Sequence, residues 1–147
     1  MTLPVIRVKL LRPAAVLPAF GSAAAAGADL TACLDASVTI APGETHLIPT
    51  GLALEIPQYF AGLIYARSGL AAKRGLAPAN KVGVVDADYR GEVMVALHNH
   101  SATAQEVAPG ERVAQLVITP FLPVNYQAAD ELDETVRGAG GFGSTGA

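Results

Sequence analysis

A chain of 147 residues has the length of one domain, long enough to bury a core and too short for two ordinary domains. Its net charge of −3, with acidic and basic residues mixed along the chain, provides no basic stripe for gathering phosphates and argues against nucleic acid as a partner. Cys33 is the only cysteine, which excludes a disulfide framework within one chain and makes the reducing cytoplasm the expected location.

The apolar content is high for a small soluble protein. Hydrophobic residues make up 51% of the chain, yet no run approaches the ~20 apolar residues of a membrane span. The stretch MTLPVIRVKLLRP at the amino terminus also lacks the continuous apolar core of a signal peptide. No membrane partner is therefore expected, and the apolar excess predicts burial between subunits.

Short apolar segments separated by turn signals predict strands along most of the chain. In chain order they are VIRVKLL (5–11), SVTIAPGETHLIPTGLALEI (37–56), FAGLIYA (60–66), VGVVD (82–86), GEVMVALHN (91–99) and RVAQLVITPF (112–121). One helix of about two turns is expected over SGLAAKRG, where Ser68 would cap the first amides and Gly75 would end the run in the left-handed conformation. The pattern predicts an all-β domain with one short helix.

The chain changes character after TPFLPVNYQ. An acidic stretch, ADELDETV, is followed by RGAGGFGSTGA, in which glycine dominates and no core can form. We therefore expect a β-rich body, residues 1–125, and a mobile C-terminal arm, residues 126–147.

The stretch GVVDADYRGE, residues 83–92, lies at the expected tip of a hairpin and allows two interpretations. Asp and Gly favour turns for conformational reasons, and a plain surface turn is the commoner case for such a stretch taken alone. In the other interpretation, Tyr89 offers a flat face to a sugar or base, and Asp86 acts as a general base toward a bound water.

Two further clusters could bind an anion. Ser68 and the free amides at the helix start, including that of Gly69, suit a phosphate beside Arg67, although a serine cap next to a solvated arginine would have the same sequence. In PGERVAQLVI, the side-chain amide of Gln115 could donate to an anion or simply face solvent.

The glycine-rich end of the arm resembles a phosphate-binding P-loop only superficially. In GAGGFGST, Ser144 stands where the lysine should be, and there is no room for the helix that a P-loop opens. The segment still offers possible phosphate donors in Arg137, Ser144 and Thr145. A disordered terminus explains the composition equally well, but Phe142 among glycines suits an arm that closes over a ligand.

The remaining polar candidates are weaker. His98 and His100 alternate on an expected strand and face the same side, but no third ligand is near in sequence, so polar strand positions are the simpler interpretation. Taken alone, Asp29 in AGADLTA and Asn80 in APANKVG would pass as turn residues.

Taken in order, AGADLTA, ARSGLAAKRGL, NKVGVVDADYRGE, PGERVAQLVI and RGAGGFGSTG resemble the five motifs of the trimeric deoxyuridine triphosphatases (dUTPases). The resemblance covers about residues 26–146. It implies a jelly-roll-like β fold, a homotrimer, and hydrolysis of dUTP to dUMP and pyrophosphate with Mg²⁺, by attack at the α-phosphorus. It also implies active sites at subunit contacts, each reached by a neighbour's glycine arm.

The resemblance also assigns roles to residues. Asp86 matches the carboxylate that orients and deprotonates the attacking water, and Tyr89 matches the ring that packs on deoxyribose and leaves no room for a 2′-hydroxyl. Asp29 matches the acidic residue near the water shell of the metal. The other expected contacts are to the uracil edge (Asn80, Val82, Gly83), to the phosphates (Arg67, Ser68, Gly69, Gln115) and from the arm (Arg137, Ser144 and Thr145 on the γ-phosphate, Phe142 over the base).

Three positions depart from the pattern that is usual in the family. Ala66 stands where many relatives have proline, Ala28 where a bulkier residue is common, and Ala87 where serine is usual. None of these changes removes a reacting group, so they bear on local rigidity and affinity rather than on the reaction.

Two other functions remain open at this point. The related dCTP deaminases share the fold, but the DADYRG segment favours hydrolysis of dUTP. A nucleotide-sensing protein that has lost turnover would also keep the fold, although every expected reacting residue is present here.

Overall fold

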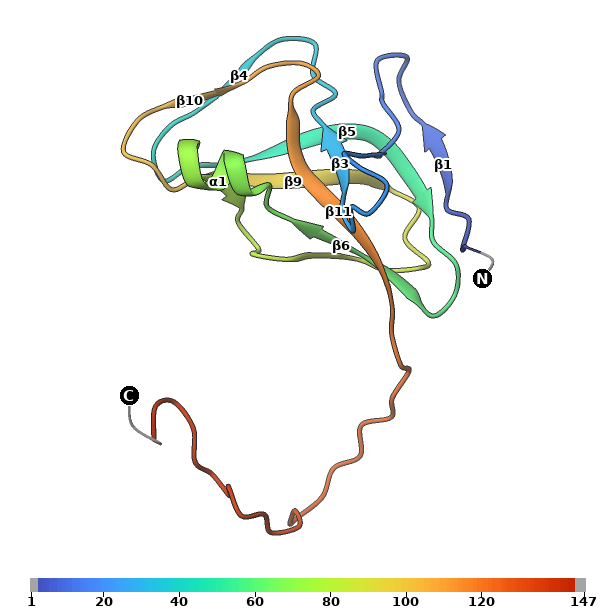
Figure 1. The fold of residues 1–147 in the computed structure, drawn as a ribbon, viewed down its shortest axis with the longest axis vertical. Coiled ribbons are helices and arrows are strands. Elements are labelled where there is room, and N and C mark those ends of the chain that lie inside the picture. The colour runs from blue at the N-terminus through green and yellow to red at the C-terminus, as the bar shows by residue number, and fades with distance from the viewer. Residues whose placement is uncertain (1–2, 145–147) are drawn as a thin grey trace.

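The computed structural model describes residues 3–144, and its regular secondary structure is antiparallel β apart from one short helix (Figure 1). The four-stranded sheet has the order β1 (Arg7–Leu10), β5 (Thr45–Glu55), β9 (Glu92–Asn99) and β7 (Leu76–Pro78). The five-stranded sheet has the order β2 (Ala19–Phe20), β3 (Ala28–Thr31), β11 (Arg112–Pro120), β6 (Phe60–Tyr65) and β8 (Gly83–Val85). A two-stranded sheet pairs β10 (Gln105–Val107) with β4 (Val38–Ile40). The predicted all-β class is confirmed.

The core lies between the two larger sheets. Buried and partly exposed residues alternate strictly along β9, as expected for a strand with one face on a core. Val95 from β9, Ile48 from β5, Leu30 from β3 and Val113 from β11 are almost fully buried and belong to one hydrophobic cluster. Because both sheets contribute to that cluster, they form a sandwich.

The helix, α1 (Ser68–Arg74), ends as predicted but starts differently. Gly75 follows it with φ of 64°, and its amide donates to the Ala71 carbonyl, which satisfies the last turn. At the other end Arg67, not Ser68, occupies the N-cap position, and no side chain caps the helix. Ser68 is therefore the first helical residue, and its hydroxyl is not used as a cap. Within residues 3–144, no helix has the length and apolar character needed to cross a membrane.

The segment between Val85 and Glu92 connects the two sheets, and the predicted hairpin is wrong. β8 pairs with β6 in the five-stranded sheet, with Gly62 opposite Val85. β9 instead pairs with β5 and β7 in the other sheet. Both strands are paired elsewhere, so residues 86–91 connect the edge strand β8 of one sheet to the inner strand β9 of the other and are not a turn between paired strands.

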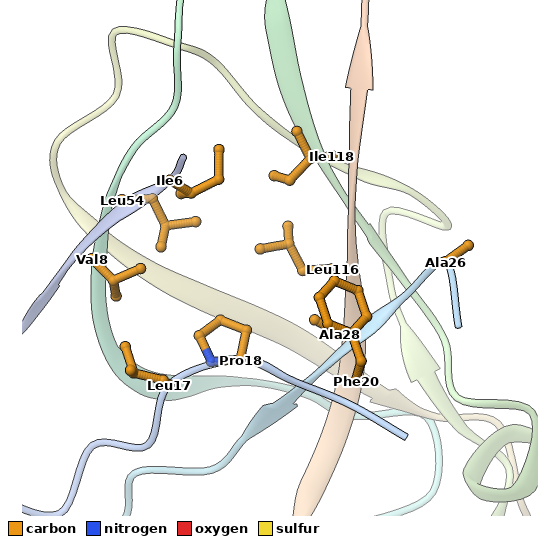
Figure 2. A pocket seen from close by; sticks show the side chains of 10 residues that line it. All are labelled: Ile6, Val8, Leu17, Pro18, Phe20, Ala26, Ala28, Leu54, Leu116 and Ile118. Carbon is orange, nitrogen blue, oxygen red and sulfur yellow. The ribbon is translucent and has the colours of Figure 1, made fainter. Parts of the chain in front are cut away.

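A cavity of ≈ 470 Å³ opens between the sheets near β1 and β2 (Figure 2). Its lining consists of Ile6, Val8, Leu17, Pro18, Phe20, Ala26, Ala28, Leu54, Leu116 and Ile118. No titratable side chain is among them, so this cavity offers apolar surface and no means of proton transfer.

The chain leaves the body after β11. Figure 1 shows residues beyond Pro120 running away from the sheets, and residues 121–144 contain no helix or strand and are almost all exposed. The last backbone hydrogen bond to the body joins the Phe121 amide to the Tyr59 carbonyl at 2.9 Å. This geometry fits the expected division into body and arm, and its boundary at residue 125 stays a prediction.

Candidate active site

A hollow of ≈ 230 Å³ lies where β8 ends and β9 begins. Its lining is Ile64, Asn80, Gly83, Val84, Val85, Asp86, Tyr89, Glu92, Val93 and Met94. Pockets for drug-sized ligands usually have about 300–1,000 Å³, so this hollow has room for part of a nucleotide rather than all of it. Of the residues that the sequence analysis expected at the base and sugar, it brings together Asn80, Gly83 and Tyr89 but not Val82.

Asp86 lies at the mouth of this hollow with its carboxylate free. The side chain is exposed and makes no hydrogen bond or ion pair with any other residue in the part of the chain that the structure describes. Its backbone carbonyl accepts from the Tyr89 amide at 3.2 Å, which fixes the start of the turn. A carboxylate with both oxygens free can orient a water molecule and accept its proton.

Tyr89 is held on the turn by its hydroxyl group, which donates to the Glu92 carbonyl oxygen at 2.9 Å. The ring lies directly over Gly91: a Cβ atom added there would be 2.4 Å from the tyrosine oxygen and 2.6 Å from Cζ. Only glycine allows this close approach. The ring remains 46% exposed, so one of its faces is available to a ligand.

A salt bridge supports the same turn from a distance, and the sequence analysis missed it. Glu92 accepts from the Gly51 amide at 2.8 Å and pairs with the guanidinium of Arg12. Arg12 lies 80 positions away in sequence, so no local pattern could have indicated it. Arg90 braces the turn itself, because it donates to the Ala87 carbonyl at 2.6 Å and to the Tyr89 carbonyl at 3.1 Å.

Asn80 and Gly83 line the other side of the hollow, whereas Val82, between them in the chain, is not part of the lining. Asn80 lies in a turn, as expected, and its carbonyl accepts from the Val82 amide at 2.7 Å. A Cβ at Gly83 would be 3.1 Å from the Asn80 Nδ2 atom, so glycine lets the amide group lie close against the strand. An amide side chain beside backbone of this kind can donate to and accept from the edge of a base.

A second polar cluster gathers around Asp29. This residue lies inside β3 rather than in the turn that the sequence taken alone suggested. Its Oδ1 accepts from Arg67 Nε at 2.7 Å, and its Oδ2 lies 3.2 Å from a guanidinium nitrogen of Arg112. With the Asp29 side chain only 17% exposed, the pairing fixes both arginines at this edge of the sheet.

Gln115 and the helix start complete the second cluster. Gln115 pairs with both Asp29 and Tyr65 across β11, and its Nε2 donates to the Ala66 carbonyl at 2.8 Å. One amide hydrogen is thus used within the protein and the other remains for a ligand. Ser68 and Gly69 begin α1 directly after Arg67, so their hydroxyl and amide groups lie beside the arginine.

The two clusters do not meet within one chain. Strands β6 and β8 are antiparallel, with Ile64 opposite Gly83 and Gly62 opposite Val85. Asp86, which follows β8, therefore lies near the start of β6. Arg67 lies beyond the opposite end of β6. Along the direction of the strands, Asp86 and Arg67 are therefore separated by six residues of extended chain, which corresponds to about 20 Å. One chain therefore carries a base-and-sugar hollow and an anion cluster at different places.

The arm residues are also separate from both clusters. Arg137 Nε donates to the Gly140 carbonyl at 2.8 Å, a contact within the arm itself. Phe142 has positive φ, 52°, and is fully exposed. Ser144 donates its amide to the Gly141 carbonyl at 3.0 Å, and Thr145 lies outside the described residues.

An antiparallel β-sandwich that presents a free carboxylate beside a sugar-sized hollow, with an arginine and amide cluster on another edge, is consistent with a nucleotide hydrolase. Comparison with known proteins makes this specific. The family model described as dUTPase matches residues 14–146. The chain belongs to the dUTPase family.

The named relatives and solved structures to which the chain is similar are also dUTPases. The deoxyuridine 5'-triphosphate nucleotidohydrolase of Janthinobacterium sp. (strain Marseille) is 50% identical over 145 residues, 96% of this chain and 97% of that protein. The enzyme of the same name from Desulfitobacterium hafniense is 53% identical over 131 residues, 88% of this chain and 87% of that protein. A dUTPase of Staphylococcus bacteriophage 80alpha solved with dUpNHpp superposes with a TM-score of 0.89 at 26% identity, covering 99% of this chain and 100% of that one.

These matches confirm the fold, the enzyme class and the reaction that the motifs implied, the hydrolysis of dUTP. They also decide against the dCTP deaminase interpretation.

Proposed function

We propose that this member of the dUTPase family hydrolyses dUTP to dUMP and pyrophosphate at sites that several copies of the chain build together. The observation that carries the proposal is the separation of about 20 Å along the strands between the Asp86 hollow and the Arg67 cluster. A nucleoside triphosphate must reach a base-binding wall and a phosphate-binding cluster at once. The hollow of one copy facing the cluster of another meets that requirement.

In this proposal, Asp86 is the general base. Its free carboxylate orients a water molecule and accepts a proton as the water oxygen bonds to the α-phosphorus. The bond from that phosphorus to the bridging oxygen breaks, pyrophosphate leaves, and no covalent nucleophile is needed. Tyr89 packs on the deoxyribose and leaves no room for a 2′-hydroxyl. Asn80, with the backbone of Val82 and Gly83, reads the uracil edge.

Arg67, Ser68, Gly69 and Gln115 hold the phosphates in this proposal. The negative charge of the triphosphate repels an incoming oxygen nucleophile. Fixed hydrogen-bond donors must therefore neutralise that charge before one carboxylate can activate water. Asp29 orients Arg67 toward this task through the 2.7 Å contact with Nε. Arg137, Ser144 and Thr145 of the arm hold the γ-phosphate, and Phe142 covers the base.

The donor set fits Mg²⁺ held mainly by substrate phosphates and water. Within residues 3–144, no group of three or more His, Cys, Asp or Glu side chains forms a protein cage for a metal. Mg²⁺ keeps several waters and is usually held through one or two carboxylates together with substrate phosphates, so no such cage is needed. Asp29 would contact its water shell, and the ion would supply charge neutralisation at the phosphates.

A homotrimer is the assembly that we propose for these shared sites. The open apolar cavity of ≈ 470 Å³ and the exposed apolar side chains beyond β11 give a single copy more apolar surface than a small monomer usually leaves in water (Figure 2). Contacts between copies would cover that surface. The enzyme would work in the cytoplasm, where it limits uracil incorporation into DNA and supplies dUMP for thymidylate synthesis.

Tyr89 gives the first test. Gly91→Ala is expected to reduce the preference for dUTP over UTP at least about tenfold, because the new Cβ would lie within the space of the tyrosine ring. The measurement is pyrophosphate release from dUTP, UTP, dTTP and dCTP. Gly21→Ala is the matched control, since a Cβ there meets no atom within 4 Å. A preference that stays unchanged in Gly91→Ala would remove Tyr89 from sugar recognition.

Mixing two inactive variants tests the shared site directly. Asp86→Asn lacks the base and Arg67→Gln lacks a phosphate contact, and each is expected to be nearly inactive alone. When the two are unfolded and refolded together in equal amounts, about one quarter of the sites should combine an intact Asp86 with an intact Arg67 from different chains. Pyrophosphate release should then return to about that fraction of the wild-type rate.

A mixture that stays inactive while forming trimers by light scattering would mean that one chain supplies both residues. The proposed arrangement would then be wrong, whereas the reaction itself would be unaffected. The same refolding of wild-type protein gives the reference rate.

A further inference from the structure

The two histidines at the end of β9 lie against each other. The ring centroids of His98 and His100 are 4.4 Å apart, with the ring planes at 63°. An ion bound at about 2.0–2.1 Å to one nitrogen of each ring, in tetrahedral geometry, places two imidazole centroids about 5 Å apart. The two rings are therefore about as close as two imidazoles bound to one ion, and rotation of the side chains would turn one nitrogen of each toward a shared ion.

The backbone that carries the pair is fixed on both sides. The amide of His100 donates to the Gly75 carbonyl at 2.7 Å. Between the two histidines, the buried side chain of Asn99 donates to the Ile40 carbonyl at 2.9 Å and to the Thr103 carbonyl at 2.8 Å. Because these contacts hold the residues before any ion binds, little ordering cost accompanies chelation.

Thr45 provides the outer contact that a metal-binding histidine usually has. Its Oγ1 lies 2.8 Å from Nδ1 of His98, directly across the strand pair. When Nδ1–H donates to this hydroxyl, the lone pair of Nε2 is left for a metal. The hydroxyl can accept from Nδ1–H, so the contact is compatible with the tautomer that ligation through Nε2 requires.

We propose that His98 and His100 form a two-point site for a divalent transition-metal ion such as Zn²⁺, separate from the catalytic Mg²⁺. Two imidazoles without a carboxylate suit zinc and its neighbours in the first transition row, whereas Mg²⁺ requires oxygen ligands. The site is six residues along β9 from Glu92 at the catalytic hollow, about 20 Å away. An ion here acts on the surface of the four-stranded sheet and not on the reacting phosphate.

The test is calorimetric titration of ZnCl₂ into the metal-free full chain, with excess MgCl₂ present throughout. Saturable binding of one ion per chain is expected. His98→Ala and His100→Ala should each remove it, and Thr45→Val should weaken it by about tenfold, because loss of an outer contact costs 10–100-fold in affinity. Melting temperatures of the variants without zinc verify that they are folded.

His46→Ala is the matched control, because this third histidine contacts Glu44 on the other strand and should leave zinc binding unchanged. Equal binding by wild type and by the His98→Ala/His100→Ala double variant would overturn the proposal. So would loss of binding in His46→Ala, or a ratio of one ion to three chains, which would place the ion between copies.

Discussion

Asp86→Asn is expected to give a folded protein that still binds dUTP and turns it over at least about 100-fold more slowly, the low end of the loss that follows removal of a general base. The asparagine keeps the size of the side chain but cannot take a proton from water. Because the Asp86 carboxylate makes no hydrogen bond or ion pair with the other described residues, no polar contact of the fold depends on its charge. Turnover is measured by pyrophosphate release, and binding by titration with a non-hydrolysable dUTP analogue.

Asp88→Asn is the control for this experiment. Asp88 lies two positions away on the same turn, is also exposed, and its side chain makes no hydrogen bond with the described part of the chain. Turnover should stay at the wild-type level. Full activity in Asp86→Asn would show that Asp86 is not the base. An equal loss in both variants would show that the charge of the turn matters rather than one base.

The sequence predicted most of the strands because their signals are local. Alternating burial along β9 and the glycine that ends α1 depend on neighbours within a few positions, and both appear as expected. Short strands such as β2 and β7 carried too few residues to show a period. Asp29 looked like a turn residue for the same reason, since its strand has only four residues.

The errors at the site come from contacts that are distant in sequence. The stretch from Gly83 to Glu92 reads as a hairpin because turn residues separate two apolar runs, but each run found its partner in a different sheet. The salt bridge between Arg12 and Glu92 crosses most of the chain and has no local signature. Sequence patterns therefore indicated candidate residues for the reaction but not the contacts that hold them.

The chemistry was easier to predict than the arrangement. Asp86 and Tyr89 share one turn, so their proximity follows from their spacing, and the structure places both at the hollow. Arg67 and Gln115 are distant in sequence, yet β6 and β11 pair so that both reach the same end. One chain cannot show how the Arg67 cluster is placed against the Asp86 hollow, because the proposed contact joins two copies of the chain.

The second large effect is expected from the arm. A chain that ends after Val136 should fold and melt like the full chain while its turnover falls about 100-fold or more, as when a fixed donor to the reacting phosphates is lost. Within the described residues, the arm beyond Phe121 makes no hydrogen bond to the body, so its removal takes nothing from the core. Arg137, Phe142 and the residues after it would no longer reach the bound triphosphate.

Melting temperature and pyrophosphate release, measured on the same preparation, separate the two roles of the arm. Arg137→Gln, which keeps the full length, should reproduce most of the loss, because the guanidinium is the only cation in residues 126–147. A double change in the acidic stretch, Glu131→Gln with Asp133→Asn, should leave both quantities unchanged, since those carboxylates have no part in the proposed closure. A truncated chain that fails to fold would show that the arm is a structural element. A truncated chain with full turnover would show that the body alone binds and neutralises the phosphates.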